Sequence, residues 1–343
     1  MSEIPSTMKR LVVISPGDSL ASCTIESQEV AVPKPVSGQV LIKVVAAAIN
    51  PSDYGTWHRC RPDQCPLAMG KEGSGVVVAS GGGLSTFKIS IGSKVGFVNL
   101  PNEQGAYSEY VVANAMNVFT MPQDLPTEDA ASFFVNPYTA IGIIDVAKNE
   151  DAKVMVHTAA ASQLGQMIVK LALSEGIEII NVVRREEQAV LLKKIGAKHV
   201  VVSSGGSWKE ELRAKIKELG ATVAFDAVAG ESTGDMMDVL PNNGTVYLYG
   251  GLMGKASNID PMNLIYKGKK LKGFFLMNWI QSGGLLSMAP RMFKASKKVN
   301  SGLKEGGWSR STFMDTTMEN AQADLVKLIE NSATGNKLRI RFD

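Results

Sequence analysis

Residues 153–276 alternate between short apolar segments and amphipathic segments, and this alternation constrains the fold more than any other feature. The apolar segments 153–157, 177–183 and 222–228 have the length of strands, whereas a segment such as 208–219 repeats apolar residues at helical spacing. Strands that are apolar along their whole length are buried on both faces, as in a parallel sheet covered by helices. We therefore predict an α/β domain built on a doubly wound parallel sheet.

The two ends of the chain have a different texture. Residues 1–130 contain short apolar runs that are broken by glycine, proline and serine, which is typical of a β-rich unit with loops. Within residues 283–343 we expect a helix at 317–331 and a strand at 337–342. The sequence thus predicts about two domains, with an α/β domain at 131–282 between the β-rich residues 1–130 and the terminal segment 283–343.

The turn after the first predicted strand of the α/β domain resembles a dinucleotide-binding fingerprint, G-x-G-x-x-G. Its three glycine positions hold Ala160, Ser162 and Gly165, which are all small enough for the tight turn, the approach of a pyrophosphate and the packing of the next helix. That helix would offer free N–H groups to phosphates. The alternative is a small-residue turn that binds nothing. We assign these turn residues to cofactor binding: Ala160, Ser162, Gln163 and Leu164.

The second predicted strand ends in two arginines, Arg184 and Arg185. NAD-binding domains place an acidic residue here, which hydrogen-bonds the adenosine ribose. A guanidinium group instead suits a 2′-phosphate, so the two arginines favour NADPH as the cofactor. The alternative is a solvated pair that faces Glu186 and Glu187 at the start of a helix.

Charge and cysteine content exclude several classes of protein. The chain has 36 basic and 33 acidic residues and a formal net charge of +3, so we expect no nucleic acid and no membrane as its main partner. No apolar run reaches the about 18 residues that a membrane span needs. Three cysteines argue against a disulfide framework and fit a reducing compartment. Because the N-terminal segment has no apolar signal core, we expect a cytoplasmic protein.

Motifs along most of the chain resemble the medium-chain dehydrogenase/reductase superfamily. Gly70-Lys-Glu-Gly-Ser-Gly75 resembles the family motif G-H-E-G-x-G, and Gly105-Ala-Tyr-Ser-Glu-Tyr110 resembles G-x-(Y/F)-A-E-Y. Further matching segments are 92–96, 136–140, 225–230 and 244–251. The resemblance implies a GroES-like catalytic domain at 1–130 and 283–343, which is interrupted by a Rossmann NADP(H)-binding domain at 131–282.

At two positions the sequence differs from the zinc enzymes of this family, and these differences indicate a zinc-free member. Those enzymes hold zinc partly through the cysteine of C-x-(S/T)-D and the histidine of G-H-E, and these positions here are Asn50 and Lys71. Lysine cannot replace imidazole as a zinc ligand at neutral pH. The three histidines, His58, His157 and His199, show no metal-ligand spacing. We therefore expect no metal.

The zinc-free branch that the chain resembles contains quinone oxidoreductases and 2-enoyl thioester reductases. Asn50-Pro-Ser-Asp53 and the segments 179–184 and 270–279 are closest to the thioester reductases. Their catalytic tyrosine, however, corresponds to Arg61 in this chain. The resemblance thus favours an NADPH-dependent reductase of a small-molecule quinone or enone. Two alternatives stay open: an enoyl thioester (enoyl-CoA or enoyl-ACP) reductase, and an NADPH-binding protein that has lost catalysis.

The resemblance also implies roles for individual residues. Asn50 and Thr139 should lie near the nicotinamide, and Gly250 and Gly251 should let it approach a strand tip. Tyr54 is the candidate proton donor, with water or a ribose hydroxyl as alternatives. The other residues expected at the cofactor are Val228, Tyr249, Phe275, Met277 and Lys337. Lys337 could reach a phosphate, with a solvated terminal lysine as the alternative. Three aromatic residues either line the substrate face or pack in the core: Tyr249, Phe274 and Trp279.

The last predicted strand of the α/β domain, at 271–276, is apolar and would leave an unpaired sheet edge in a monomer. Such edges invite pairing with a second chain, and two-fold symmetry closes the assembly at two subunits. Lys269, Lys270 and Lys272 argue against this pairing, because edge lysines oppose it. Relatives in the superfamily commonly extend their sheets in this way, so we predict a homodimer.

Overall fold

The computed structural model describes residues 3–99, 104–304, 306–331 and 334–342. The chain forms two compact units, the first from residues 1–135 with 298–343 and the second from residues 136–297. The second boundary lies within helix α9 (Leu285–Gly302), and most of this helix belongs to the second unit.

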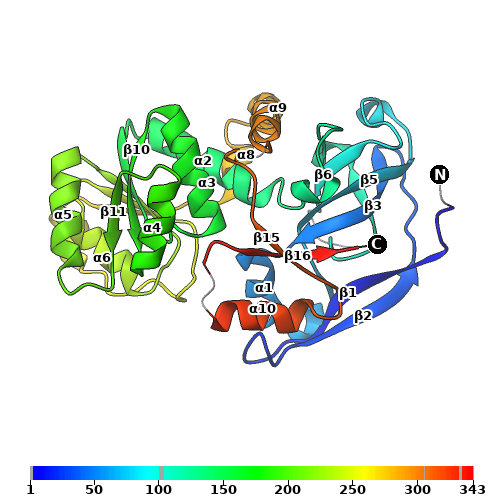
Figure 1. The fold of residues 1–343 in the computed structure, drawn as a ribbon, viewed down its shortest axis with the longest axis horizontal. Coiled ribbons are helices and arrows are strands. Elements are labelled where there is room, and N and C mark those ends of the chain that lie inside the picture. Colours follow the sequence, from blue (N-terminus) through cyan, green and yellow to red (C-terminus); the bar gives the residue numbers. More distant parts are fainter. Residues whose placement is uncertain (1–2, 100–103, 305, 332–333, 343) are drawn as a thin grey trace. The chain divides into compact units, whose positions relative to one another are not determined.

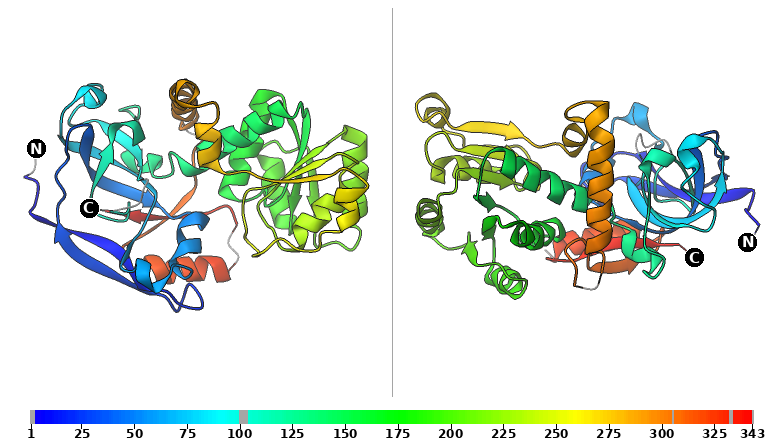
Figure 2. Two further views of the ribbon diagram at one scale, coloured as in Figure 1. Left: turned by 180° about the vertical axis from the view of Figure 1, so that it is seen from behind. Right: turned by 90° about the horizontal axis from the view of Figure 1, so that it is seen from above.

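The second unit is built on a parallel sheet with helices on both faces, as Figures 1 and 2 show. Its strand order is β11-β10-β9-β12-β13-β14, and every neighbouring pair is parallel. The strands are β9 (Val154–His157), β10 (Glu178–Val183), β11 (His199–Val202), β12 (Val223–Asp226), β13 (Thr245–Leu248) and β14 (Lys270–Gly273). The order reverses between β9 and β12, and ligands of doubly wound sheets bind at the carboxyl ends of the strands at such a point. The predicted doubly wound sheet is confirmed.

The helices of the second unit begin and end where local chemistry allows. The side chain of Ser162 caps the helix at Gln163–Glu175. Gly176 ends this helix, and Gly220 ends the helix at Trp208–Leu219, both in the left-handed conformation that glycine tolerates. The helices are α2 (Val135–Asn149), α3 (Gln163–Glu175), α4 (Glu186–Lys194), α5 (Trp208–Leu219), α6 (Glu231–Val239), α7 (Pro261–Ile265), α8 (Leu276–Gln281) and α9 (Leu285–Gly302).

One expectation for the second unit is wrong, and one of its helices was not predicted. The strand predicted at 271–276 ends at Gly273, and Leu276 instead begins α8. All four residues of β14 are exposed, because this strand is the edge of the sheet. Helix α9 was not expected, since Pro290 within it and its serines weaken the helical pattern.

The first unit contains two sheets. The smaller has the order β2-β1-β4, and the larger has the order β15-β16-β3-β5-β6-β8, with β7 also paired to β3. The strands are β1 (Thr7–Ser15), β2 (Thr24–Ala31), β3 (Gln39–Ala48), β4 (Leu67–Ala68), β5 (Glu72–Ser80), β6 (Lys94–Val98), β7 (Tyr110–Asn114), β8 (Val118–Thr120), β15 (Phe313–Thr316) and β16 (Lys337–Arg341). The helices are α1 (Pro51–Trp57) and α10 (Ala321–Glu330), with short 3-10 turns η1 (Pro62–Gln64), η2 (Leu84–Thr86), η3 (Ala115–Asn117) and η4 (Thr127–Ala130).

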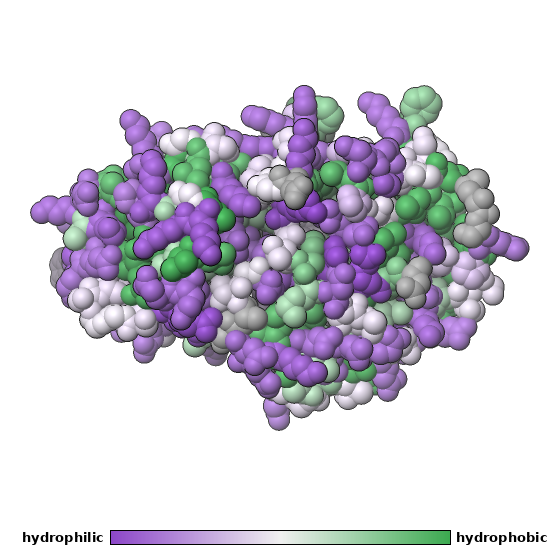
Figure 3. Space-filling model, in the orientation of Figure 1, coloured by the Kyte–Doolittle hydropathy of each residue, from purple (hydrophilic) through white to green (hydrophobic). Residues whose placement is uncertain are grey.

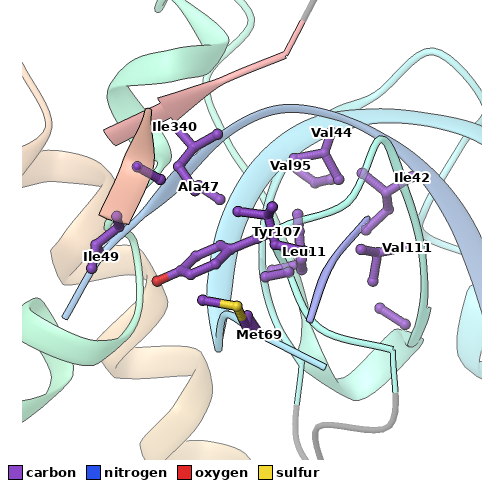
Figure 4. Close-up of a cluster of buried hydrophobic side chains, with 14 of the residues drawn as sticks. Leu11, Ile42, Val44, Ala47, Ile49, Met69, Val95, Tyr107, Val111 and Ile340 are labelled. Atoms are coloured by element: carbon purple, nitrogen blue, oxygen red, sulfur yellow. The ribbon is translucent and has the colours of Figure 1, made fainter. Parts of the chain in front are cut away.

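A buried hydrophobic cluster joins the strands of the first unit, and Figure 4 shows the ring of Tyr107 inside it. This ring explains why residue 70, the first of its motif, must be glycine. Gly70 has a φ of +90°, and a Cβ atom there would lie 2.4 Å from the ring of Tyr107. Gly105 has a φ of +73°, and its Cβ would lie 2.2 Å from the carbonyl oxygen of Met69. Only glycine fits these two positions.

On the face in Figure 3, hydrophilic side chains predominate and hydrophobic residues lie between them. Such scattered apolar residues are ordinary for a protein surface. Within the described ranges, no helix has both the length and the apolar composition required to span a bilayer.

Candidate active site

The turn between β9 and α3 has the geometry that the fingerprint predicts. A Cβ atom on Gly165 would lie 2.2 Å from the carbonyl oxygen of Ala160, so only glycine lets the helix approach the turn this closely. The Ser162 hydroxyl accepts a hydrogen bond of 3.0 Å from the Gly165 N–H and caps the helix. The first N–H groups of a helix have no partner within it. This turn therefore places the positive end of α3 beside the reversal point of the sheet, where a phosphate would be stabilised.

Asp226 is the last residue of β12, and its buried carboxylate holds the end of this strand in place. One carboxylate oxygen accepts hydrogen bonds from the hydroxyls of Thr158 and Ser232, at 2.7 and 3.1 Å, and the other from the Thr233 hydroxyl at 2.8 Å. The backbone N–H of Val228 adds a bond of 3.0 Å. Asp226 thereby ties the end of β12 to the residue that follows β9. Asp226 lies in the motif segment 225–230, but its local sequence gives no sign of this role.

The two arginines lie at the carboxyl end of β10, directly before α4. The side-chain oxygen of Gln188 accepts hydrogen bonds from their backbone N–H groups, at 2.9 Å for Arg184 and 3.2 Å for Arg185. The side chain of Arg184 is exposed and that of Arg185 is half-buried. Among the described residues Arg184 has no ion pair, so its guanidinium group is open to an anionic ligand.

His157 and Tyr249 contact each other at the carboxyl ends of the strands. His157 is the last residue of β9, and Tyr249 directly follows β13. The Nε2 atom of His157 lies 2.6 Å from the hydroxyl oxygen of Tyr249, and the two rings stack with centroids 5.9 Å apart. Burial lowers the pKa of His157 to about 3 and raises the pKa of Tyr249 well above its usual range. Both side chains are therefore neutral at pH 7, which fits a packed and hydrogen-bonded pair.

We expect acidification from pH 7 to pH 5 to remove about 2 kcal/mol of folding free energy through His157 alone. The unfolded chain binds this proton near pH 6.5, whereas the folded chain binds it only near pH 3. The stabilisation is therefore complete above pH 6.5 and is lost as the pH falls toward 3. Urea unfolding at the two pH values measures it, with His157→Gln as the control. Equal losses in both proteins would contradict the assignment.

The first unit holds a buried cluster of polar residues around Glu72. The Nζ atom of Lys337 donates to the side-chain oxygen of Asn50 at 2.6 Å and to the Ser132 hydroxyl at 2.8 Å, and lies 3.6 Å from Glu72 Oε1. The Asn50 amide donates to the same Glu72 oxygen at 2.9 Å, while Phe134 N–H donates to Oε2 at 2.9 Å. The side chain of Glu72 is fully buried and that of Lys337 is 6% exposed.

Sheet register explains how residues so far apart in sequence meet. Strand β16 pairs antiparallel with β3, and Arg339 lies opposite Ala48. Continued by two residues, this register sets Lys337 opposite Asn50. The structure thus brings two predicted site residues, Asn50 and Lys337, into contact in a buried cluster. Burial lowers the pKa of Lys337, whereas the carboxylates of Glu72 and Asp53 oppose that shift.

A second set of polar contacts continues from this cluster into α1. Asp53 Oδ2 accepts hydrogen bonds from the backbone N–H of Asn50 at 2.8 Å and from the Tyr107 hydroxyl at 3.1 Å. Burial raises the pKa of Asp53, and the charge of Lys71 partly offsets this effect. The candidate proton donor Tyr54 is half-buried, and burial raises its pKa, followed by the charge of Asp53. Its phenol therefore stays protonated at neutral pH.

The other predicted site residues lie in the second unit. Thr139 is buried in α2, and the backbone of Val228 bonds to Met253 just beyond β12. Gly250 packs so closely that a Cβ atom would lie 2.6 Å from the carbonyl oxygen of Ala227, whereas Gly251 has more room. Phe275 is 60% exposed at the N-cap of α8. Met277 is in the first turn of α8, and the rings of Phe274 and Trp279 pack against Gly142 of α2.

Two family models match the chain: the alcohol dehydrogenase GroES-like domain over residues 36–123, and the zinc-binding dehydrogenase over residues 164–289. The mitochondrial enoyl-[acyl-carrier-protein] reductases of Bos taurus and Xenopus tropicalis are 31% and 32% identical to it. The first match covers 80% of this chain and 74% of the relative, and the second covers 71% of each.

Solved structures agree with these matches. A candidate NADPH:quinone reductase from Mesorhizobium loti superposes with a TM-score of 0.86 at 31% identity, covering 99% of this chain and 100% of the other. The quinone oxidoreductase of Escherichia coli, solved with NADPH, has a TM-score of 0.81 at 19% identity and shares the fold over 97% of this chain and 100% of its own.

The sheet order, the two domain models and the relatives together define an oxidoreductase of the dehydrogenase type. The chain belongs to the medium-chain dehydrogenase/reductase family, of the quinone oxidoreductase and enoyl reductase type. The predicted fold class, a Rossmann-type parallel sheet combined with a GroES-like domain, is confirmed.

Proposed function

We propose that this protein transfers a hydride from NADPH to a small-molecule quinone or α,β-unsaturated carbonyl compound, without zinc. The proposal rests on the two residues at the family's zinc-ligand positions, Asn50 and Lys71, which stand in place of cysteine and histidine. The Asn50 side chain is bonded to Glu72 and Lys337, and the Lys71 ammonium group donates to the carbonyl oxygen of Ser52. In the part of the chain that the structure describes, no three His, Cys, Asp or Glu residues lie close enough together to hold a metal ion.

Two features of the second unit support the binding of a dinucleotide. The Ala160–Gly165 turn leaves no room for a side chain at Gly165, and α3 presents its positive end there. We propose that Ala160, Ser162, Gln163 and Leu164 bind the pyrophosphate, and that Arg184 and Arg185 bind the 2′-phosphate. When bound, the nicotinamide supplies the hydride. The NADPH complex of the Escherichia coli neighbour supports this choice of cofactor.

Arg184→Ala should weaken NADPH binding by roughly tenfold or more and leave NADH binding almost unchanged. A charged hydrogen bond to a phosphate contributes about 1.5–3 kcal/mol. NADH has no 2′-phosphate, so it forms no such bond with Arg184 and loses almost no affinity when Arg184 is replaced. Titration calorimetry with both cofactors measures the difference. Equal losses of affinity for NADPH and NADH would sink the assignment of this arginine.

An enoyl thioester reductase is the second candidate, and the relatives favour it. The Bos taurus and Xenopus tropicalis proteins are named enoyl-[acyl-carrier-protein] reductases. At the tyrosine position of that group, this chain has Arg61, which is exposed and bonded to Asp63 at 3.0 Å. We propose Tyr54 as the proton donor in its place, because its phenol is half-buried and protonated. Water and a cofactor hydroxyl remain the other donors to compare.

A steady-state assay of NADPH oxidation tests the proposal. The purified chain is offered a quinone, an enone and a 2-enoyl thioester, before and after dialysis against a strong chelator. Faster turnover of the quinone or enone supports our proposal, and faster turnover of the thioester selects the second candidate. Binding of NADPH with no turnover of any acceptor would indicate a cofactor-binding protein without catalysis. Activity that is lost on dialysis and restored by zinc would overturn the metal-free assignment.

We propose that the protein is a homodimer joined through the edge of the second unit. All four residues of β14 are exposed, and the strand has a neighbour on one side only. Exposed apolar side chains before, within and after it support an interface: Met262, Leu264, Ile265, Tyr266, Leu271 and Phe275. Light scattering at micromolar protein should give twice the chain mass of 36.7 kDa. A mass near that of one chain, independent of concentration, would refute the dimer.

We propose a cytoplasmic location, with no nucleic acid or membrane partner. The three free cysteines fit a reducing compartment, and the net charge of +3 offers little to a polyanion. The names of the two enoyl reductases place them in mitochondria, so cell fractionation should compare these two compartments. Recovery of the protein with mitochondria would contradict the proposal.

A further inference from the structure

Two of the three cysteines lie against each other in the first unit. Cys60 follows α1, Cys65 follows the short turn η1, and their sulfur atoms are 3.7 Å apart. The Cys60 thiol is buried and donates to the carbonyl oxygen of Trp57 at 3.2 Å. Cys65 is only half-buried. None of the proposed roles in hydride transfer uses this pair.

The third cysteine provides an internal reference. Cys23 is buried, and its thiol donates to the carbonyl oxygen of Leu20 at 3.1 Å. The side-chain amide of Gln322 lies 3.5 Å from the Cys23 sulfur atom. Cys23 therefore has the environment of an inert structural thiol, whereas the other two combine contact with partial access to solvent.

We propose that Cys60 and Cys65 form a reversible disulfide when the protein meets hydrogen peroxide, which makes this pair a redox modification site. In the first step the Cys65 sulfur is oxidised to a sulfenic acid and the peroxide O–O bond breaks, releasing one water. In the second step the Cys60 thiol loses its proton as its sulfur attacks the Cys65 sulfur. The S–S bond forms, the S–O bond breaks, and this proton leaves with the hydroxyl group as a second water. Two thiols and one peroxide thus give one disulfide and two waters.

The environments of the two thiols set the order of these steps. Cys65 is the thiol that solvent and peroxide reach. Burial raises the pKa of Cys60 to about 11, so Cys60 stays protonated at pH 7 and does not compete for peroxide. To form the bond, the two sulfur atoms must approach from 3.7 Å to about 2.05 Å, a change within reach of a side-chain rotation.

The disulfide would tie the turn at 61–64 to the end of α1. Trp57 and Cys60 belong to the same buried cluster, and Tyr54 and Cys65 pack against it. The bond therefore restrains the segment that follows Tyr54. Formation of the disulfide itself requires no assumption about the activity of the protein, so failure of the proposed function would leave this inference standing.

Counting free thiols in the denatured protein after peroxide treatment tests the inference. The wild-type chain has three cysteines, and its count should fall from three to one and return to three with dithiothreitol. Cys23→Ser should fall from two to none, whereas Cys65→Ser should keep both of its thiols. Peptide mapping of the oxidised wild type should find Cys60 joined to Cys65 within one chain.

Three results would overturn it. The first is a wild type that keeps all three thiols under peroxide that oxidises free dithiothreitol. The second is a Cys65→Ser variant that loses as many thiols as the wild type. The third is a map in which Cys65 is oxidised to a sulfinic acid or joined to a second chain, with no link to Cys60.

Discussion

Lys337→Met should lower the free energy of unfolding by about 3–5 kcal/mol, because it leaves the Glu72 carboxylate buried without its cation. Methionine keeps most of the lysine volume, so the change removes the ammonium group with little loss of packing. The Glu72 side chain is fully buried, and the Lys337 ammonium group also holds the side-chain oxygen of Asn50 at 2.6 Å. Urea unfolding followed by far-UV circular dichroism gives the value.

Two further variants make this test specific. Lys327 forms only an exposed contact of 3.9 Å with Asp324, so Lys327→Met should cost less than about 0.5 kcal/mol. Adding Glu72→Gln to Lys337→Met removes both charges and should restore a large part of the lost stability. A Lys337→Met protein as stable as Lys327→Met would show that Glu72 does not depend on this cation.

Gly165→Ala should reduce NADPH affinity by roughly 100-fold or more while the protein stays folded. The added Cβ would lie 2.2 Å from the carbonyl oxygen of Ala160, so the turn must open and move the start of α3. Charged hydrogen bonds to phosphate contribute about 1.5–3 kcal/mol each, and the loss of two accounts for this factor. Titration calorimetry measures the affinity, and circular dichroism checks the fold.

Gly176 at the other end of the same helix provides the matched control. It has a φ of +72°, and a Cβ atom there meets nothing within 4 Å. Gly176→Ala should therefore cost about 1 kcal/mol of stability through backbone strain and leave the affinity for NADPH unchanged. Equal losses of affinity in the two variants would contradict the assignment of the Ala160–Gly165 turn.

Local patterns in the sequence predict much of the second unit, because its strands are apolar throughout and its helices carry their own start and stop signals. Helix α5 has the predicted bounds and ends at Gly220. The pattern is weaker at β14, whose apolar run continues past Gly273 into α8 and conceals the turn between them. Helix α9 escapes prediction because Pro290 interrupts its pattern.

Contacts between distant segments are what the sequence leaves open. Lys337 reads locally as a terminal lysine that could reach a phosphate, and only the pairing of β16 with β3 sets it beside Asn50 and Glu72. Asp226 likewise shows its role only when β12 lies beside β9, where Thr158 reaches its carboxylate. No spacing rule within one segment predicts such partners.

Transfer of deuterium from labelled cofactor tests the central claim most directly. NADPH that carries deuterium at both C4 positions of the nicotinamide is incubated with the purified chain and an enone, and the product is analysed by mass spectrometry and NMR. Our account predicts one deuterium, at the β-carbon of the reduced product. A reduced product without deuterium, or no consumption of any acceptor while NADPH binds, would contradict it.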